Sequence, residues 1–271
     1  MDGIELGRAL REGRRVYGTL IASPSPFWVP KVASLGLDFV FIDTEHIPLD
    51  RSQAAWMCQA YAAAGLAPIV RIPMPDPYHA CMALDGGAVG LVAPYIETVE
   101  QVKALRGAVK LRPIKGAQLD SLLAGQTELA EDVAAYEETW NRGRLLILNI
   151  ESVAGIEALP ELLAVPGVDA VLIGPHDLSI SLGIPERYDH PDFDAAVRTI
   201  FRTARKAGVA AGIHYSYGLE TEITWAREAG LNFIIHNSDI GGFVQQIGGD
   251  IRRLRMELGD EGHGEAGAVD V

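Results

Sequence analysis

Short apolar runs alternate with segments of helical periodicity along nearly the whole 271-residue chain. Eight runs have this character, in the order YGTLIA, DFVFID, APIVRI, AVGLVAP, LLILNIE, DAVLIG, VAAGIH and LNFIIH. An apolar run without polar interruption indicates a strand that is covered on both faces, as in a parallel sheet. Helical segments such as 51–64 and 192–207 separate the runs. Eight strands alternating with helices predict an α/β protein with the (β/α)8 architecture of a TIM barrel.

A doubly wound open sheet is the alternative fold for such an alternation. That fold binds phosphate on a glycine-rich turn after its first strand, whereas SPSPFW follows the first run here. We therefore favour a single barrel domain over residues 1–258. Residues 259–271 (GDEGHGEAGAVDV) are rich in glycine and acidic side chains, which predicts a disordered tail.

The net charge of -13 and the hydrophobic content of 48% bound the classes of function. This acidic balance, without a basic cluster, argues against nucleic acid or an anionic membrane surface as a partner. The uncharged run from residue 52 to 70 is broken by Gln53, Gly65 and Pro68, so no membrane span is predicted. The two cysteines, Cys58 and Cys81, cannot form a disulfide framework, and we expect a cytoplasmic protein.

The segment from Leu145 to Asp177 reads as strand, helix and strand, and each strand is followed closely by a carboxylate. Glu151 follows the first strand and Asp177 follows the second. The crossover makes the two strands parallel, so both acids leave the same edge of the sheet. Two acids at such an edge suit a hard divalent cation. The alternative is that each acid caps the helix that follows it.

The second and third strands also end in polar residues, and barrel enzymes place their chemistry at such ends. His46, in the segment DTEH that begins at Asp43, is a candidate general base because imidazole titrates near neutral pH. The alternative for His46 is a hydrogen bond to a loop carbonyl. Arg71 interrupts an apolar strand, so it must either pair with an acid or bind an anionic substrate. The candidate acids are Asp43, Glu45 and Asp85, the last at a helix end where the dipole disfavours an acid.

Three more histidines fall near strand ends, namely His176, His214 and His236. They lack the HxH or HxxxH spacing of many zinc sites, so we expect them to line a pocket at most. None of the lysines lies at a strand end, which disfavours a Schiff-base mechanism. The lysines are Lys31, Lys103, Lys110, Lys115 and Lys206.

The interval between the fourth and fifth strands is the longest in the chain. It holds LRPIKGAQLDSLLAG and a helical stretch around residues 129–140. An excursion on the catalytic face of a barrel is commonly a lid or a specificity element. A packing insertion or an oligomer contact is an equal alternative.

Five motifs in order, FIDTEH, PIVRI, ALDGGAVGLVAP, LNIES and IGPHDLSISLG, resemble the HpcH/HpaI aldolase family, with similarity over about residues 18–254. This family consists of class II pyruvate aldolases such as 4-hydroxy-2-oxoheptanedioate aldolase and 2-dehydro-3-deoxygalactarate aldolase. The resemblance implies a barrel of the phosphoenolpyruvate/pyruvate superfamily whose last helix is exchanged between the subunits of a hexamer. It also implies cleavage or formation of 4-hydroxy-2-oxo acids, to or from pyruvate (or hydroxypyruvate) and an aldehyde, with Mg²⁺, Mn²⁺ or Co²⁺ as cofactor.

The resemblance further implies roles for individual residues of this sequence. Glu151 and Asp177 would ligate the metal. The catalytic residues would be His46 as base, Asp85 raising the basicity of His46, and Arg71 and Asp43. The substrate would contact Asn149, at a position that is usually Gln, and Gly174, Pro175, His176 and Asp177.

Two departures from the family concern the aldehyde half of the site. LRPIKG replaces a Tyr-Pro-Pro…Arg-Gly loop, and GIHYSYG and IIHNSD replace apolar ends of the last two strands. We expect some of Lys115, His214, Tyr215 and His236 to face the aldehyde fragment. A decarboxylase or a CoA-ester lyase on the same scaffold is the nearest alternative, and a non-catalytic pyruvate-binding protein is the alternative from another class.

Overall fold

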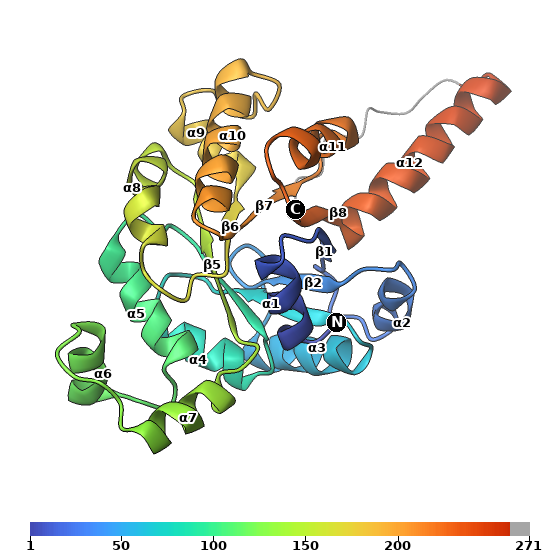
Figure 1. Cartoon of the computed structure of the whole chain (residues 1–271). Helices are drawn as coiled ribbons and strands as arrows, with labels where there is room; N and C mark the ends of the chain where they lie inside the picture. Colours follow the sequence, from blue (N-terminus) through green and yellow to red (C-terminus); the bar gives the residue numbers. More distant parts are fainter. Residues whose placement is uncertain (261–271) are drawn as a thin grey trace.

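The computed structural model describes residues 1–260, so all but the first two residues of the predicted tail (259–271) lie outside the described residues. Eight parallel strands follow one another around a closed barrel, and β8 pairs with β1 (Figure 1). The prediction of a (β/α)8 barrel is therefore confirmed. The strands are β1 (Val16–Leu20), β2 (Phe39–Asp43), β3 (Ala67–Arg71), β4 (Gly90–Ala93), β5 (Leu145–Asn149), β6 (Ala170–Ile173), β7 (Ala210–Tyr215) and β8 (Phe233–Ser238).

Glycines let large rings fill the barrel interior. Phe39 on β2 and Phe233 on β8 stack with their ring centroids 4.8 Å apart. A Cβ atom at Gly18 or Gly212, on the neighbouring strands, would overlap with these rings. Both glycines therefore make room for the stack, as glycine in a strand often does where another group approaches closely. This apolar packing fills the barrel below the carboxyl ends of the strands, so polar side chains can collect only at the rim.

Twelve helices accompany the strands within residues 1–260. Local signals set several of their starts: Asp50 and Thr98 each accept a hydrogen bond from a backbone amide of the first turn in a capping box. No helix among the described residues has both the length and the apolar character that a membrane span requires. The helices are α1 (Gly3–Arg11), α2 (Trp28–Ala33), α3 (Arg51–Ala63), α4 (Pro77–Asp85), α5 (Val99–Lys110), α6 (Gly116–Leu123), α7 (Glu131–Trp140), α8 (Val153–Leu163), α9 (Pro175–Ser181), α10 (Pro191–Lys206), α11 (Leu219–Glu228) and α12 (Asp239–Leu258).

The long excursion between β4 and β5 lies at the amino ends of the strands. Asn141 donates a hydrogen bond of 2.7 Å to the carbonyl of Arg112, in the segment LRPIKG. Arg144 donates one of 2.5 Å to the carbonyl of Ala88, just before β4 begins. Within one chain, the excursion cannot cover the carboxyl rim, so the lid interpretation is wrong for the single chain. Tyr136 and Trp140 stack on each other at the exposed surface of α7, which favours the packing or oligomer interpretation.

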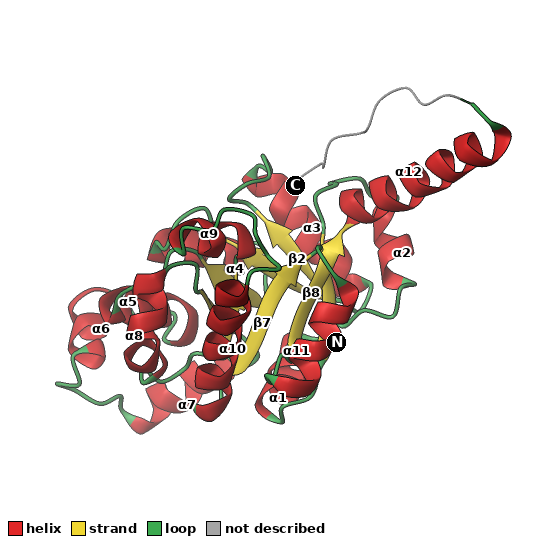
Figure 2. Cartoon of the chain, turned by 90° about the horizontal axis from the view of Figure 1, so that it is seen from above, coloured by secondary structure: helices red, strands yellow, loops and turns green. Residues whose placement is uncertain are grey.

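Helix α12 projects away from the barrel instead of packing back on it (Figures 1 and 2). It begins at Asp239, earlier than the predicted start at residue 242, because Ser238 Oγ accepts a hydrogen bond from the Gly241 amide at 2.8 Å. None of its residues is buried. Its exposed apolar stripe consists of Phe243, Ile247, Ile251, Leu254 and Leu258.

Candidate active site

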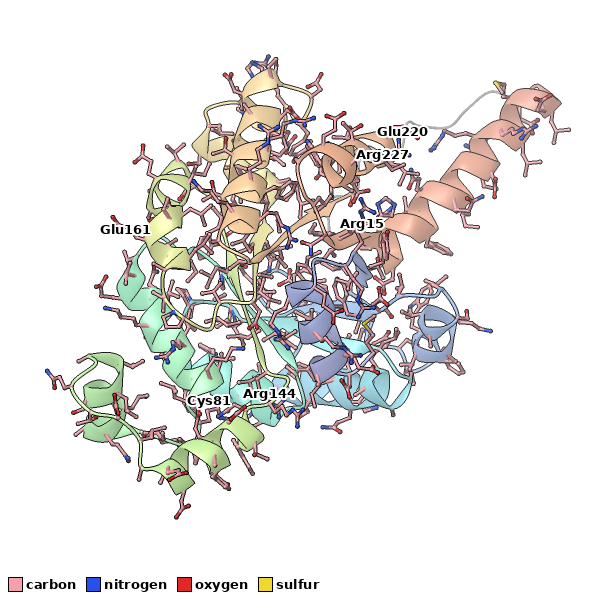
Figure 3. All side chains as sticks on the ribbon, viewed as in Figure 1. Arg15, Cys81, Arg144, Glu161, Glu220 and Arg227 are labelled. Carbon is pink, nitrogen blue, oxygen red and sulfur yellow. The ribbon has the colours of Figure 1, made fainter. Side chains whose placement is uncertain are left out.

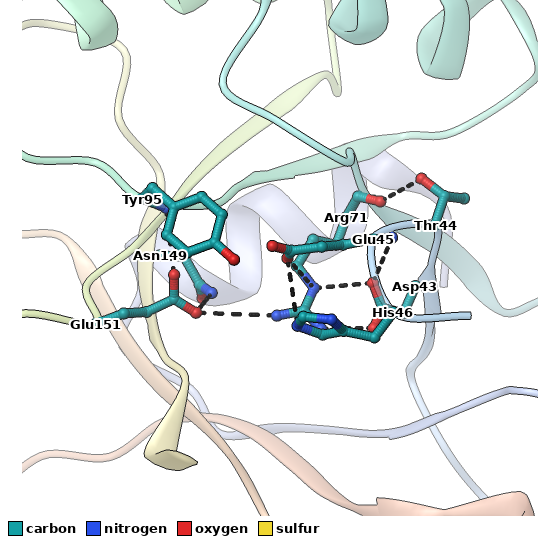
Figure 4. A network of polar contacts seen from close by, with 8 residues as sticks. All are labelled: Asp43, Thr44, Glu45, His46, Arg71, Tyr95, Asn149 and Glu151. Atoms are coloured by element: carbon teal, nitrogen blue, oxygen red, sulfur yellow. Dashed lines mark hydrogen bonds and ion pairs between the residues drawn. The ribbon is translucent and has the colours of Figure 1, made fainter. Parts of the chain in front are cut away.

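Arg71, at the end of β3, lies in the middle of a cluster of acidic side chains (Figure 4). Its Nε and Nη2 atoms donate to the two carboxylate oxygens of Asp43 at 2.9 and 2.5 Å. Nε also lies 3.2 Å from Oε2 of Glu45, and Nη1 lies 3.9 Å from Oε1 of Glu151. The guanidinium carbon lies 5.7 Å from the centroid of the Phe41 ring. The two-pronged contact with Asp43 and the ring of Phe41 hold the guanidinium in one orientation.

This pairing fixes the charges of Arg71 and Asp43. Burial alone would raise the pKa of Asp43, but the hydrogen bonds and the charge of Arg71 hold it below its ordinary value. Burial likewise opposes the charge of Arg71, but its contacts with Asp43 and Glu45 raise its pKa. The acids that pair with Arg71 are therefore Asp43 and Glu45, and not Asp85.

Glu151 lies directly beyond β5 and is held by two donors. Its Oε1 accepts a hydrogen bond from Nδ2 of Asn149, and its Oε2 accepts one of 3.2 Å from the backbone amide of Tyr95. Tyr95 has a φ of 53°, in the left-handed region that non-glycine residues rarely adopt. The backbone amide that donates to Glu151 therefore belongs to a residue in an uncommon conformation. A Cβ atom at Gly174 would overlap with Oε1 of Glu151. The backbone after β6 can therefore approach this carboxylate closely only because residue 174 is a glycine.

The surroundings of Glu151 fit a divalent cation. Burial raises the pKa of its carboxyl group to about 7, although Arg71 opposes the shift, and the charge of Asp177 adds to it. Oδ1 of the buried Asn149 has no hydrogen-bond partner among the described residues. A hard cation between Glu151 and Asp177 would favour both ionised carboxylates and would take oxygen ligands. Within residues 1–260 no group of three or more His, Cys, Asp or Glu side chains lies close enough together to hold a metal ion.

His46 lies at the exposed side of the same cluster. Its side chain is 53% exposed, and its Nε2 lies 3.8 Å from Oε2 of Glu45. An accessible imidazole beside a carboxylate suits proton transfer. Asp85, by contrast, ends α4 and pairs with Arg112 of the excursion. Within one chain Asp85 therefore does not contact His46, contrary to the prediction. The acid beside this imidazole is Glu45.

One cavity of about 620 Å³ opens at the carboxyl rim and unites most of the predicted site residues. Gly174 and Pro175 begin the short helix α9, and Asp177 lies in its first turn. The imidazole of His176 lies 3.6 Å from Glu186, at the mouth of the cavity. The predicted residues that line the cavity are Asp43, His46, Arg71, Asn149, Gly174, Pro175, His176 and Asp177.

Of the residues expected near the aldehyde fragment, only His214 lines this cavity. Tyr215 is buried in the wall of the barrel, with its ring centroid 5.0 Å from that of Trp225. His236 points to the outside of the barrel, where its Nδ1 lies 2.5 Å from Oε2 of Glu222. Lys115 lies in the excursion at the opposite end of the barrel.

Sequence reasoning named Glu45 as a candidate partner of Arg71, but it missed the contact of Glu45 with His46, and it missed Tyr95 altogether. Glu45 contacts both Arg71 and His46. The hydrogen bond between the Tyr95 hydroxyl and Glu45 raises the pKa of the tyrosine. Both residues directly follow strand ends, so applying the strand-end rule to every polar and aromatic residue there would have found them.

Comparison with known proteins agrees with this arrangement. Residues 17–230 match the family described as HpcH/HpaI aldolase/citrate lyase. The hydroxypyruvate/pyruvate aldolase of Roseovarius nubinhibens is 32% identical over 235 residues, covering 86% of this chain and 89% of that protein. The 2-keto-3-deoxy-L-rhamnonate aldolase of Klebsiella pneumoniae is 30% identical over 256 residues, covering 93% and 92%. The crystal structure of a family protein from Burkholderia cenocepacia gives a TM-score of 0.77 at 30% identity and covers 93% of this chain and 99% of that one. Fold and sequence agree in these comparisons, and the chain belongs to the HpcH/HpaI aldolase/citrate lyase family.

Proposed function

We propose that this protein is a class II pyruvate aldolase, a carbon–carbon lyase that cleaves or forms 4-hydroxy-2-oxo acids. Its products in cleavage are pyruvate, or hydroxypyruvate, and an aldehyde. Family membership and the names of the relatives support this reaction class. The observation that carries the proposal is the position of a fixed guanidinium, that of Arg71, beside the carboxylate of Glu151, which is itself influenced by the charge of Asp177.

Glu151 and Asp177 would hold Mg²⁺, Mn²⁺ or Co²⁺, which when bound supplies Lewis-acid polarisation of the 2-oxo oxygen of the substrate. The Asn149 side chain and the Tyr95 amide orient the carboxylate of Glu151. Gly174 keeps the rim open beside that carboxylate. The second sphere thus fixes the ligand before anything binds, as in other metal sites.

Arg71 stabilises the negative charge that develops on the substrate when the bond between C3 and C4 breaks. Arg71 lines the cavity, and its Nη1 lies 3.9 Å from Oε1 of Glu151. A fixed charge aimed at a developing oxyanion is typically worth about 3 kcal/mol. Asp43 acts as a positioning residue, because it touches Arg71 and fixes its orientation.

His46 takes the proton from the C4 hydroxyl during cleavage and returns it during addition. Its exposed position lets the imidazole exchange that proton with water. The carboxylate of Glu45 lies 3.8 Å from Nε2 of this imidazole.

The alternatives place different demands on the same cavity. A CoA-ester lyase needs basic groups for its nucleotide, and the chain has a net charge of -13. A decarboxylase of oxaloacetate-like acids would use the same carboxylates and Arg71, and only its products distinguish it. A non-catalytic pyruvate-binding protein has no use for an accessible imidazole beside a fixed guanidinium.

One assay tests the proposal: release of pyruvate from a panel of 4-hydroxy-2-oxo acids and of oxaloacetate, with and without a chelator. We expect EDTA to abolish aldehyde and pyruvate formation, and Mg²⁺, Mn²⁺ or Co²⁺ to restore it. Glu151→Gln and Asp177→Asn should fold but lose the response to metal, whereas His79→Leu, a change on the outer helix α4, should keep it. Full activity in excess EDTA, or borohydride trapping of a lysine adduct, contradicts a class II mechanism. Release of CO₂ from oxaloacetate without any aldol cleavage favours the decarboxylase.

We also propose that copies of the chain associate through α12, most simply as a hexamer. A groove of about 1010 Å³ lies between α2, α11 and the first turns of α12. Trp28, Leu35 and Ile223 give it an apolar lining, and the lining also includes Arg15 and Arg227, two residues that are labelled in Figure 3. This groove is where the helix after β8 would pack if it returned to its own barrel. The apolar stripe of α12 from another copy has the chemistry to fill it.

Light scattering at micromolar concentration tests the association. We expect a monodisperse hexamer for the wild type and smaller species for Ile251→Asp, which places a charge in the stripe. Glu257→Gln on the same helix is the matched control. A wild-type monomer overturns the proposal.

We propose the cytoplasm as the location, since Cys58 and Cys81 are both free thiols. Labelling of the two thiols in freshly lysed cells without reductant tests this, and two oxidised cysteines contradict it.

A further inference from the structure

Tyr95 lies in the short segment between β4 and α5, and it contacts carboxylates that follow two different strands. Its backbone amide donates to Oε2 of Glu151, beyond β5, at 3.2 Å. Its hydroxyl group makes a hydrogen bond with the side chain of Glu45, beyond β2, and points toward that carboxylate in Figure 4. One residue thus joins the side of the cluster that holds Glu151 to the side that holds His46. The inference below rests on the proposed aldolase activity.

The backbone of Tyr95 is held at both of its polar groups. The amide is used by Glu151, and the carbonyl accepts a hydrogen bond of 3.1 Å from Nε2 of Gln101. Gln101 is itself fixed at the start of α5, where its Oε1 accepts from the amides of Glu97 and Thr98 at 2.9 Å each. These contacts hold Tyr95 in its left-handed conformation. The direction in which the side chain leaves the backbone is therefore fixed.

The carboxylate of Glu45 needs a donor that it does not share. Its side chain is only 7% exposed, and Nε of Arg71 lies 3.2 Å from its Oε2. The same Nε donates to Asp43 at 2.9 Å, however, and within residues 1–260 Oε2 of Glu45 makes no hydrogen bond of ordinary geometry. A misaligned ion pair attracts a carboxylate but orients it poorly. The hydroxyl group of Tyr95 is a donor that Asp43 does not compete for.

The orientation of Glu45 matters because His46 depends on it. Nε2 of His46 lies 3.8 Å from the same Oε2, and the imidazole is 53% exposed, so little packing holds the ring. A group that transfers a proton must lie within hydrogen-bond reach of that proton, and a small displacement slows the transfer. A carboxylate that is fixed beside the imidazole limits such a displacement.

We propose that Tyr95 is a positioning residue for proton transfer: its hydroxyl group holds the Glu45 carboxylate in the orientation that keeps His46 in place. Tyr95 acts through Glu45 and does not itself exchange a proton with the substrate. Its hydroxyl group is dispensable for holding Glu151, because that contact uses the backbone amide.

Tyr95→Phe tests this, because it removes the hydroxyl group and keeps both backbone contacts. The ring is half-exposed, so the variant should fold. For the 4-hydroxy-2-oxo acid of the panel that the wild type cleaves fastest, kcat should fall by about tenfold or more, with KM changed less than about twofold. The affinity for Mn²⁺, measured by calorimetry, should stay within about twofold. Tyr78→Phe, at an exposed tyrosine of α4, is the matched control and should keep wild-type kcat.

A double-mutant cycle asks whether the effect passes through Glu45. Glu45→Ala should lower kcat for cleavage, and adding Tyr95→Phe to it should lower kcat by less than about a further twofold. Decarboxylation of oxaloacetate in the presence of Mn²⁺ is a second readout. Loss of CO₂ forms the same enolate and takes no proton from a C4 hydroxyl group, so Tyr95→Phe should leave this rate nearly unchanged.

The outcomes separate this inference from the proposed function. If Tyr95→Phe cleaves as fast as Tyr78→Phe, or if its effect multiplies with that of Glu45→Ala, the role of Tyr95 is refuted while the aldolase activity stands. A fall in Mn²⁺ affinity or in decarboxylation as large as the fall in cleavage also refutes it, because Tyr95 would then act on the enolate half. A wild type that cleaves no acid of the panel with Mn²⁺ present refutes the aldolase proposal and this inference with it.

Discussion

At the scale of single residues, the chemistry depends on Arg71 being held by two acids at once. We expect Arg71→Lys to lower kcat/KM for every 4-hydroxy-2-oxo acid by about 10²- to 10³-fold, because an ammonium cannot reproduce the fork on Asp43 and still face the substrate. Metal binding, measured by calorimetry, should be retained. Arg198→Lys, in a partly exposed ion pair between α10 and α11 that is not part of the cavity lining, is the control and should change kcat/KM little. A lysine variant that keeps more than about a tenth of wild-type activity would contradict the oxyanion role.

Most single residues of the site could be predicted because they follow strand ends. Strand ends alone indicate Asp43, Arg71 and Asp177, whereas Asn149 follows only from the resemblance to the family; all four line the cavity. The partner of His46 could not be predicted, since a side-chain contact depends on how neighbouring loops fold over the rim. Glu45 holds that place within one chain, whereas Asp85 is paired with Arg112.

At the scale of elements, the strands and most helices could be predicted from the alternation of apolar runs. The end of the barrel at which the long excursion lies was harder to infer. The excursion after α5 was expected on the catalytic face, but a helix returns the chain to the amino ends of the strands. An insertion that follows the helix and precedes the next strand therefore lies at the amino end, as α6 and α7 do. Following the chain direction through α5 is therefore enough to place the excursion at the amino ends of the strands.

The contact between β8 and α11 gives a prediction about pH and stability. The hydrogen bond with Glu222 raises the pKa of His236 above its ordinary value near 6.5. A raised pKa in the folded state favours the protonated form, so this stabilisation is fully present below pH 6.5 and is lost as the pH rises through the raised value. The Tm of the wild type relative to that of Glu222→Gln should therefore decrease from pH 6 to pH 9. Glu220→Gln, an exposed change on the same helix, is the control. A difference that does not depend on pH would rule out this linkage.

At the scale of the whole molecule, the metal site should lower the stability of the metal-free protein. Burial raises the pKa of Glu151 to about 7, so at pH 8 its buried charge opposes folding. Glu151→Gln should raise the unfolding free energy of the metal-free protein at that pH by on the order of 1–3 kcal/mol. It should also remove the rise in Tm that Mn²⁺ gives the wild type. Calorimetric scans with and without Mn²⁺ measure both effects, and a less stable metal-free Gln variant contradicts the prediction.

The projection of α12 also has a consequence for how the stability of the molecule depends on protein concentration. The helix carries its apolar stripe away from the barrel, and the groove beside α2 and α11 is left for a stripe from elsewhere. Under the proposed association, burying the two surfaces is a bimolecular event, governed by mass action as well as by the sequence. The Tm should rise with protein concentration, and the final part of the hydrophobic burial should form at a rate that depends on how often chains meet. If the proposed association holds, a chain diluted below the dissociation constant of the assembly keeps a folded barrel but exposes the apolar stripe of α12, so aggregation competes with assembly at that stage of folding.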